Sequence, residues 1–303
     1  MSLSHPRTQL HTVKPLMGVR TTIALAVLAL GVLLSAPSAL MAQTSLGSAK
    51  NFGVLGSSTV TNTGATTIKG DVGVSPGSSI TGKETITLDG TYHQADGVAQ
   101  QAQVDAMNAY NALAAMTVTT NLTGQDLGGM TLTPGVYFFS SSAQLTGNLT
   151  LDFQGNPNAQ FVFQIGSTLT TASGATVSVI NGGSTNAVYW QVGSSATLGT
   201  STVFAGNILA HSSVTMTTGA KILCGRAIAL TGAVTLDNNV ISNDCLNGGD
   251  FGSGNTDFGS AGFSGGAMTT TPEPGTLLLV GTGLTGLGAA WRRRRSSGVG
   301  ASA

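Results

Sequence analysis

Short β-rich runs separated by glycine return about every 20 residues through much of residues 43–246. Four of them begin at Phe161, Val188, Ile208 and Ala227, and a run of the same pattern begins at Phe52. Strands this short cannot bury a core alone, so successive copies must stack coil upon coil. The repeat therefore predicts a mostly β domain built as a β-solenoid.

Alternation along each strand assigns residues to the two sides of the predicted sheets. One aligned column is apolar and should point into the core: Val60, Leu151, Leu169, Leu198, Met216 and Leu236. The column before it is entirely threonine and should point outward: Thr59, Thr150, Thr168, Thr197, Thr215 and Thr235. Further outward positions follow within the copies: Thr61, Thr170, Thr217, Thr171, Thr200 and Thr218. The repeat thus predicts a flat face of recurring hydroxyl and methyl groups, although threonine is also simply a good strand former.

One segment departs from the β pattern. Residues 95–116 are rich in alanine and glutamine, and their apolar side chains recur at about 3.6-residue spacing. The stripe consists of Ala99, Ala102, Ala106, Tyr110, Leu113 and Met116. We expect one long α-helix that lies along the solenoid and buries this stripe.

The N-terminus has the order of a secretory signal peptide. Cationic residues up to Arg20 precede an apolar stretch over 23–34, and small residues lead to a predicted cleavage near Ala42. The alternative, a transmembrane helix, needs a longer apolar stretch than this one. Residues 1–42 are therefore predicted to direct export, with the folded domain over residues 43–246.

The C-terminus carries a second targeting pattern. A Gly/Ser-rich stretch over 247–271 is predicted to be a flexible linker. Pro272-Glu273-Pro274, a short apolar stretch and four arginines (Arg292–Arg295) follow, with a cytoplasmic tail predicted over 296–303. A plain single-pass anchor is one interpretation. The order of parts in 272–295 also resembles the PEP-CTERM sorting signal of Gram-negative bacteria, which implies processing by an exosortase and a cell-envelope or extracellular location, commonly with an exopolysaccharide matrix.

The charge and cysteine content of the exported part argue against nucleic acid and metal as partners. Residues 43–274 hold five cations and twelve anions, a net charge of 5 − 12 = −7, so the exported part has no basic stripe with which to bind nucleic acid. Charged residues are only 8% of the chain, against about 25% in an average protein. Because export implies an oxidising compartment, Cys224 and Cys245 are predicted to form a disulfide rather than to bind a metal.

Catalysis finds little support in the sequence. The seven aspartates between Asp71 and Asp237 are scattered, and Asp152 and Asp237 occupy equivalent repeat positions that suit turn or capping residues. His211 is a lone histidine after a strand, and the serine clusters lack a nucleophile motif. We expect no enzyme activity, no catalytic residue, no metal and no cofactor.

Longer motifs carry a resemblance to a known family. The pattern LGSAKNFGVLGSSTV…GDVGVSPGSSITG, the Ala-rich segment, LGGMTLTPGVYFF, VYWQVGSSATLGTSTVFAGNILA and GRAIALTGAVTLDNNVIS resemble the microbial ice-binding protein family from residue 46 to about 242. The resemblance implies a right-handed, discontinuous β-solenoid of triangular cross-section, with the helix packed alongside. It also implies a protein, expected to be a monomer, whose partner is ice or ordered water.

The predicted function is adsorption to ice through the flat threonine-rich face, which would inhibit ice growth and recrystallisation. Which of the three sides binds ice is left open by the sequence. The alternative is a matrix adhesin or glycan-binding surface protein, which would need exposed aromatic side chains such as Tyr137 and Trp190. Exposure of Trp190 beside Tyr137 would favour that alternative.

Overall fold

The structure is a computed structural model that describes residues 45–156, 158–182 and 186–243. The predicted signal peptide, the linker, the sorting segment and tail, and Cys245 lie outside the described residues. The described strands pair in parallel and form two sheets, of 15 and seven strands. The prediction of a mostly β solenoid with one α-helix alongside is confirmed.

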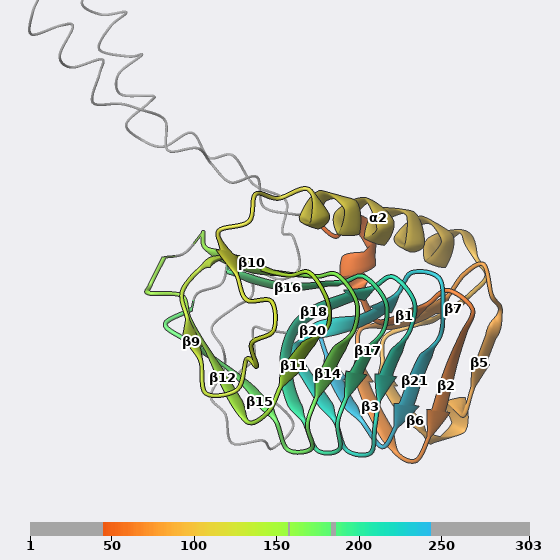
Figure 1. Cartoon of the computed structure of the whole chain (residues 1–303). Coiled ribbons are helices and arrows are strands. Elements are labelled where there is room, and N and C mark those ends of the chain that lie inside the picture. The colour runs from red at the N-terminus through yellow and green to blue at the C-terminus, as the bar shows by residue number, and fades with distance from the viewer. Residues whose placement is uncertain (1–44, 157, 183–185, 244–303) are drawn as a thin grey trace, which may run out of the picture. The chain divides into compact units, whose positions relative to one another are not determined.

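The stacked strands form three faces, which we name by their most prominent feature. The seven-stranded sheet is the threonine face, and its strands run side by side across Figure 1. In order they are β11 (Ala143–Leu145), β14 (Leu169–Thr171), β17 (Ala196–Leu198), β19 (Val214–Met216), β21 (Val234–Asp237), β2 (Thr59–Thr63) and β5 (Ser79–Thr81).

The 15-stranded sheet covers the other two faces, because two long strands bend from one face to the next. These are β18 (Val203–Ala210) and β20 (Lys221–Ala229), whose register shifts between Ala205 and Gly206. Gly206 has a φ of 103°, and a side chain at Gly225 would place its Cβ 2.0 Å from the Gly206 carbonyl oxygen. Glycine at these positions lets the two chains turn the same corner in contact.

The helix face contains the second halves of β18 and β20. Its other strands are β8 (Thr120–Asn121), β10 (Gly135–Phe139), β13 (Gln160–Ile165), β16 (Ala187–Val192), β1 (Phe52–Gly56), β4 (Asp71–Val74) and β7 (Tyr92–Gln94). The charged face contains the first halves of β18 and β20. Its other strands are β9 (Thr131–Leu132), β12 (Asn148–Asp152), β15 (Thr176–Ile180), β22 (Val240–Ser242), β3 (Thr66–Lys69) and β6 (Ile86–Asp89). Short 3-10 helices precede β1 and β6, at η1 (Gly47–Asn51) and η2 (Lys83–Thr85).

The coils are discontinuous in sequence, as the family resemblance implied. The C-terminal strands β21 and β22 supply two sides of one coil, and the N-terminal strand β1, which pairs with β20, supplies the third. The N-terminal coils then continue the stack, since β2 pairs with β21 and β3 pairs with β22. The two ends of the described chain therefore meet inside the stack.

The long helix α2 (Gly97–Ala114) covers the helix face (Figure 1). Asp96 caps its N-terminus by accepting a hydrogen bond from the Ala99 backbone N–H at 2.8 Å. Ala99, Ala102, Ala106 and Leu113 of the predicted apolar stripe are buried, and Tyr110 and Met116 are half-buried. The Gln164 amide joins the sheet to the helix end by donating to the Leu113 and Met116 carbonyl oxygens at 2.7 and 2.9 Å.

Apolar and aromatic side chains fill the inside of the coils. Every residue of the apolar column predicted from the sequence is at most 1% exposed. The Phe163 and Trp190 rings stack with centroids 3.9 Å apart, and Phe204 continues the row 4.8 Å from Trp190. This dense interior holds each face rigid.

Candidate functional site

A single row of outward side chains crosses all seven strands of the threonine face. We call it the central ladder: Gln144, Thr170, Thr197, Thr215, Thr235, Thr61 and Thr81. Adjacent rungs are direct partners in the parallel pairing of neighbouring strands. Six successive coils therefore present threonine at the same position.

A second row lies two residues earlier on each strand, so it points to the same side. We call it the flanking ladder: Ser142, Thr168, Ser195, Ser213, Ala233, Thr59 and Ser79. The register is marked by the pairing of Thr59 with Ser79, and by a 2.8 Å hydrogen bond from the Thr168 hydroxyl to the Ser142 hydroxyl. Six of the seven flanking positions carry a hydroxyl group, and Ala233 is the exception.

Strand geometry fixes the spacing of these groups. Neighbouring strands lie about 4.8 Å apart, and residues two apart on a strand are separated by roughly 6.6 Å. The two ladders thus form a two-dimensional lattice of small side chains. None of the fourteen ladder positions carries a charge, so no long ionic side chain stands above this lattice.

The floor beneath the ladders is apolar and tightly filled. The inward residues between the two ladders are Ala143, Leu169, Ala196, Val214, Val234, Val60 and Ile80, all at most 7% exposed. β-Branched threonine has few χ1 rotamers, so little side-chain freedom remains on such a sheet. The lattice is therefore preformed.

Hydrogen bonding distinguishes the central ladder from the threonines at the neighbouring corner. Within the described residues, no protein group bonds the side-chain hydroxyls of Thr61, Thr81, Thr170, Thr197, Thr215 or Thr235. By contrast, Thr217 donates to the Leu198 carbonyl oxygen at 2.8 Å, and Thr218 donates to Asp237. The hydroxyls of the central ladder therefore remain available to water.

The threonines predicted from the sequence fall into five places, three of them at or beside the threonine face. Thr61, Thr170, Thr197, Thr215 and Thr235 belong to the central ladder, and Thr59 and Thr168 belong to the flanking ladder. Thr200, Thr217 and Thr218 lie where the threonine face meets the charged face, and Thr200 lies 3.4 Å from Thr217 between hydroxyl oxygens. The single column proposed from Thr59 to Thr235 is therefore wrong, because Thr61 is the partner of Thr235.

Two predicted positions do not belong to the threonine face surface. Thr150 lies on β12 of the charged face, where it pairs with Thr131 and Ser178. Thr171 points into the coil and is 3% exposed. Its hydroxyl lies 2.8 Å from that of Thr202 and accepts a 2.8 Å hydrogen bond from the Gly199 backbone N–H. The outward orientation expected for Thr171 is thus wrong, because this hydroxyl closes a buried turn.

Thr81 and the serines of the flanking ladder were missed from the sequence. A signal for Thr81 was present, since Ser78-Ser79-Ile80-Thr81 follows a glycine as Ser57-Ser58-Thr59-Val60-Thr61 does. The serines immediately precede an apolar inward residue in several copies, as Ser142, Ser195 and Ser213 do. Alignment on threonine alone could not show that serine occupies an equivalent rung.

The ladder ends at a carboxylate. Asp126 forms an isolated bridge with Gln144, and it accepts hydrogen bonds from the Gly128 and Thr146 backbone N–H groups at 2.6 and 2.9 Å. Burial works to raise the pKa of Asp126, but these hydrogen bonds outweigh it, and the pKa is lowered. The charged Asp126, which forms a turn, therefore lies at the Gln144 end of the two neutral ladders.

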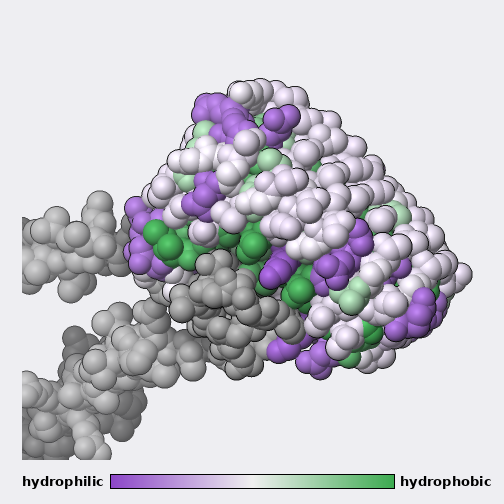
Figure 2. Space-filling model, turned by 90° about the horizontal axis from the view of Figure 1, so that it is seen from below, coloured by the Kyte–Doolittle hydropathy of each residue, from purple (hydrophilic) through white to green (hydrophobic). Residues whose placement is uncertain are grey.

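The other two faces differ in character. α2 covers the helix face, and the charged face exposes ionic side chains beside large apolar ones, including Lys69, Asp89, Lys221 and Ile180. Figure 2 views the domain from the side on which β12, β15, β3 and β6 lie in Figure 1, and its hydrophilic residues form separate patches among paler and hydrophobic ones. The threonine face is thus the flat face that combines neutrality with regular spacing.

The described residues offer less support for a metal site, an aromatic glycan site or a catalytic aspartate. Among the described residues, no group of three or more His, Cys, Asp and Glu side chains could hold a metal ion. Trp190 is fully buried with its indole N–H donating to the Ala205 carbonyl oxygen at 3.0 Å, and Tyr137 is 6% exposed. Asp152 accepts from the Gln154 backbone N–H and the Asn181 amide, both at 2.8 Å, as a turn-capping residue would. Cys224 is disulfide-bonded, while its pairing with Cys245, outside the described residues, stays a prediction.

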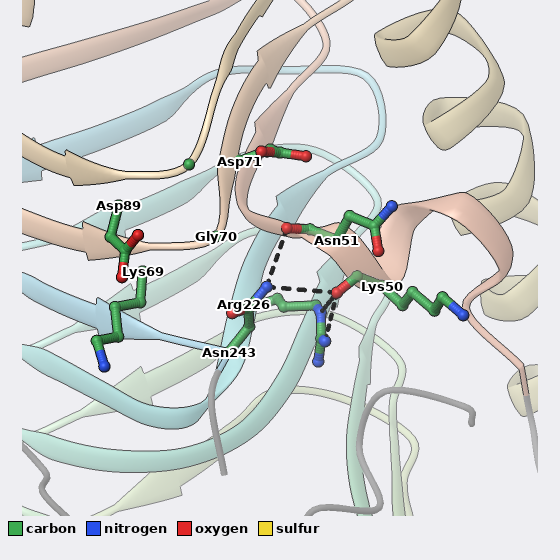
Figure 3. A pocket seen from close by; sticks show the side chains of 9 residues that line it. Lys50, Asn51, Lys69, Gly70, Asp71, Asp89, Arg226 and Asn243 are labelled. Carbon is green, nitrogen blue, oxygen red and sulfur yellow. Dashed lines mark hydrogen bonds between the residues drawn. The ribbon is translucent and has the colours of Figure 1, made fainter. Parts of the chain in front are cut away.

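One polar cavity of about 570 Å³ lies at the corner between the helix face and the charged face (Figure 3). Its lining includes Lys50, Lys69, Asp71, Arg226 and Asn243. Arg226 is 1% exposed, and burial lowers its pKa to about 10. In the described part of the chain, no helix is long and apolar enough to span a bilayer.

Comparison with known proteins gives consistent results. The family model for ice-binding-like proteins matches residues 54–242, and the model of the PEP-CTERM protein-sorting motif matches residues 270–295. The ice-binding protein of Nostoc sp. (strain HG1) is 54% identical over 254 residues, which is 84% of this chain and 88% of the relative. The ice-binding protein of Flavobacterium frigoris (strain PS1) is 30% identical over 65% of this chain and 75% of its own length.

Solved structures agree with the sequence relatives. An ice binding protein from an Antarctic biological consortium aligns with a TM-score of 0.63 and 46% identity, over 66% of this chain and 90% of that chain. An ice-binding protein from the Antarctic ascomycete Antarctomyces psychrotrophicus aligns with a TM-score of 0.62 and 40% identity, over 66% and 97% of the two chains.

Proposed function

The chain belongs to the ice-binding-like family, and on this premise we propose that it adsorbs to ice through the threonine face. The family assignment and the PEP-CTERM signal expected from the sequence are both confirmed. The proposal for this particular face is carried by one observation. Six stacked threonines present hydroxyl groups that no protein group bonds among the described residues, in ladders whose positions carry no charge.

The chemistry of threonine suits a surface that orders water. Its methyl group is poorly hydrated and favours a cage of water molecules around it. Its hydroxyl can donate and accept, so it anchors that cage at a fixed point. Repeated at about 4.8 Å between coils and roughly 6.6 Å along strands, these groups would hold a layer of water in a regular array that can join an ice lattice.

Because the threonine face is rigid, its many weak contacts with ice can form at the same time. Because the apolar floor and the neighbouring strands fix the ladders before ice is present, adsorption costs little conformational entropy. Each contact is small, and the number of aligned contacts makes the adsorption persistent. An adsorbed protein blocks growth at the points where it sits, which would inhibit ice growth and recrystallisation.

The setting of this activity is the cell envelope or the exterior. The N-terminal signal peptide and the PEP-CTERM motif support export, exosortase-type processing and attachment through the C-terminus. The absence of catalytic activity, cofactors and nucleic-acid partners, a monomeric state and an association with an exopolysaccharide matrix stay predictions. The glycan-binding alternative loses its main support, because Trp190 and Tyr137 are both buried.

The test is a blocked ladder with a matched control. The variant Thr197→Tyr/Thr215→Tyr places two bulky rings in the middle of the central ladder and should abolish crystal shaping and recrystallisation inhibition. The control Thr150→Tyr adds the same ring to a strand of the charged face and should retain full activity. Circular dichroism would check that all three proteins are folded. Equal activity of the three would remove the threonine face from consideration, and an inactive native protein would refute ice binding itself.

A further inference from the structure

The two ends of the described chain meet at one corner of the solenoid. The chain leaves the last strand, β22, at Asn243, and η1 leads the N-terminal segment into β1. The Asn243 side-chain amide donates to the Asn51 carbonyl oxygen at 2.9 Å, and this contact is drawn in Figure 3. The chain therefore enters its first strand, β1, beside the point at which it leaves its last strand, β22.

This corner is tightly fixed. Arg226 begins the second half of β20 there, and its Nε donates to the Lys50 carbonyl oxygen at 2.9 Å while its Nη1 donates to Asn207 Oδ1 at 2.7 Å. At Gly70 an added Cβ would lie 2.4 Å from the Asn243 amide nitrogen. The disulfide-bonded Cys224 lies two residues before Arg226, at the same turn. Buried charge-assisted bonds and close packing hold the end of the chain in place.

The corner lies opposite the threonine face. Successive segments pass from the threonine face to the charged face and then to the helix face, as β19 and the two halves of β20 do. Cys224 and Asn243 both fall at the turn between the charged face and the helix face. In a three-sided coil, that turn is the corner farthest from the third side, which carries both ladders.

We propose that this protein holds ice while it remains attached through its C-terminal segment, and so acts as an anchor between ice and the surface that bears it. This inference rests on the proposed function and on the sorting motif matched over residues 270–295. Because the chain leaves at the corner opposite the ladders, attachment there leaves the threonine face unobstructed for contact with a crystal. The same lattice that would adsorb a free molecule to ice would then fasten its carrier to ice.

Attachment through a segment that leaves the domain beside the ladders would instead hinder contact with ice. The Thr200–Ser201 turn borders the threonine face, and both residues are exposed. A carrier attached there would stand next to the rungs and block the approach of a flat crystal. The site of attachment therefore separates a tethered ice adhesin from a protein that functions only after release.

Streptavidin beads carrying the full chain would test this. One form has a biotin-acceptor peptide after Ala303, and a second has the same peptide between Thr200 and Ser201. A third carries the C-terminal peptide together with Thr197→Tyr/Thr215→Tyr. Each form is first measured free in solution for crystal shaping, and its beads are then counted on growing ice under flow.

We expect the C-terminally attached beads to be retained on the order of tenfold better than beads attached at the turn, because only the first geometry allows many copies to engage together. The third form should not be retained. If the C-terminally attached protein shapes ice when free but its beads are not retained, the anchor role is refuted. Equal retention of both attachments would refute the argument that the exit corner makes this role possible. If the free native chain does not shape ice, the proposed function fails and the anchor role fails with it.

Discussion

Thr235 and Thr61 are direct partners in the pairing of β21 with β2, although they lie near opposite ends of the described chain. This contact joins the C-terminal coils to the N-terminal coils and makes the central ladder continuous. Without it, the ladder would divide into a run from Gln144 to Thr235 and a pair formed by Thr61 and Thr81. The length of the uninterrupted ladder therefore depends on the tertiary structure, because contact between the first and last coils joins the two shorter runs.

Extending the ladder should increase activity. Gln144 is the exposed partner of Thr170 and the one position of the central ladder without a threonine. We expect Gln144→Thr to place a seventh threonine in the central ladder and to raise thermal hysteresis at equal protein concentration, because one more aligned contact strengthens adsorption. Gln100→Thr, at an exposed position of α2, is the matched control and should leave thermal hysteresis unchanged. No gain from Gln144→Thr would mean that ladder length does not limit adsorption.

Adjacent threonines should separate stability from ice binding. Thr171→Val removes the acceptor of the Gly199 N–H inside the coil, and a buried donor left unpaired costs about 1–3 kcal/mol of unfolding free energy. Thr170→Val removes an exposed hydroxyl and should change stability by less than about 0.5 kcal/mol. Urea unfolding measures the first effect, and recrystallisation inhibition per folded molecule measures the second. We expect Thr171→Val to lose stability alone and Thr170→Val to lose inhibition alone; the reverse pattern would contradict the assigned orientations.

Arg226 should be needed to hold the N-terminal segment. Arg226→Met leaves the Lys50 carbonyl and the Asn207 amide oxygen without their charged donor, so we expect a loss of about 3 kcal/mol in the free energy of unfolding. Arg226→Lys should rescue little, because one ammonium group cannot reproduce the planar fork of donors. Hydrogen exchange of η1 and β1 amides would show where protection is lost. Full rescue by lysine would indicate that only the positive charge matters.

Acid should loosen the attachment of α2 to η1. The Asp105 carboxylate accepts hydrogen bonds at 2.7 Å from both the backbone N–H and the hydroxyl of Ser48. Burial works to raise the pKa of Asp105, but these bonds and one from Gln101 outweigh it and lower the pKa below its ordinary value. The stabilisation is thus fully present above about pH 4 and is lost as the pH falls through the lower pKa of the folded state.

The variant Asp105→Asn isolates this contribution. It should lower the free energy of unfolding by about 1 kcal/mol near neutral pH, and the difference from the native protein should shrink as the pH falls below about 4. Thermal unfolding monitored by circular dichroism at several pH values measures both. A difference that stays constant over this range would show that the carboxylate charge has no part in the contact.

Sequence periodicity was sufficient for the inside and outside of the coils, but not for their register. Val60, Leu169 and Leu236 are all buried as alternation predicted, because period two follows from strand geometry alone. The face to which each strand belongs depends on the number of residues at each corner. The similar segments ending in Asp152 and Asp237 therefore lie on different faces, and Thr150 was placed with the wrong partners.

The register of the N-terminal coils was also beyond what the sequence alignment could show. Aligning Thr59 with Thr235 was off by two residues, because a long stretch of chain separates β2 from β21 and no single turn between them fixes their register. Alternation from the inward Leu169 already places Thr171 on the inner side, and only its hydrogen bond with the Gly199 N–H lay beyond the local sequence. The helix was the easier prediction, since its composition, apolar stripe and Asp96 cap are all local.

The joining of the first and last coils also fixes an order of events for an exported chain. During N-to-C synthesis, β1, β2 and β3 emerge early, yet the strands against which they join the stack, β20, β21 and β22, are made last. The solenoid can close only after residue 242 has been made. A chain of this topology stays open while it is being exported, and completes its ordered surface only when almost all of the domain has reached the far side of the membrane.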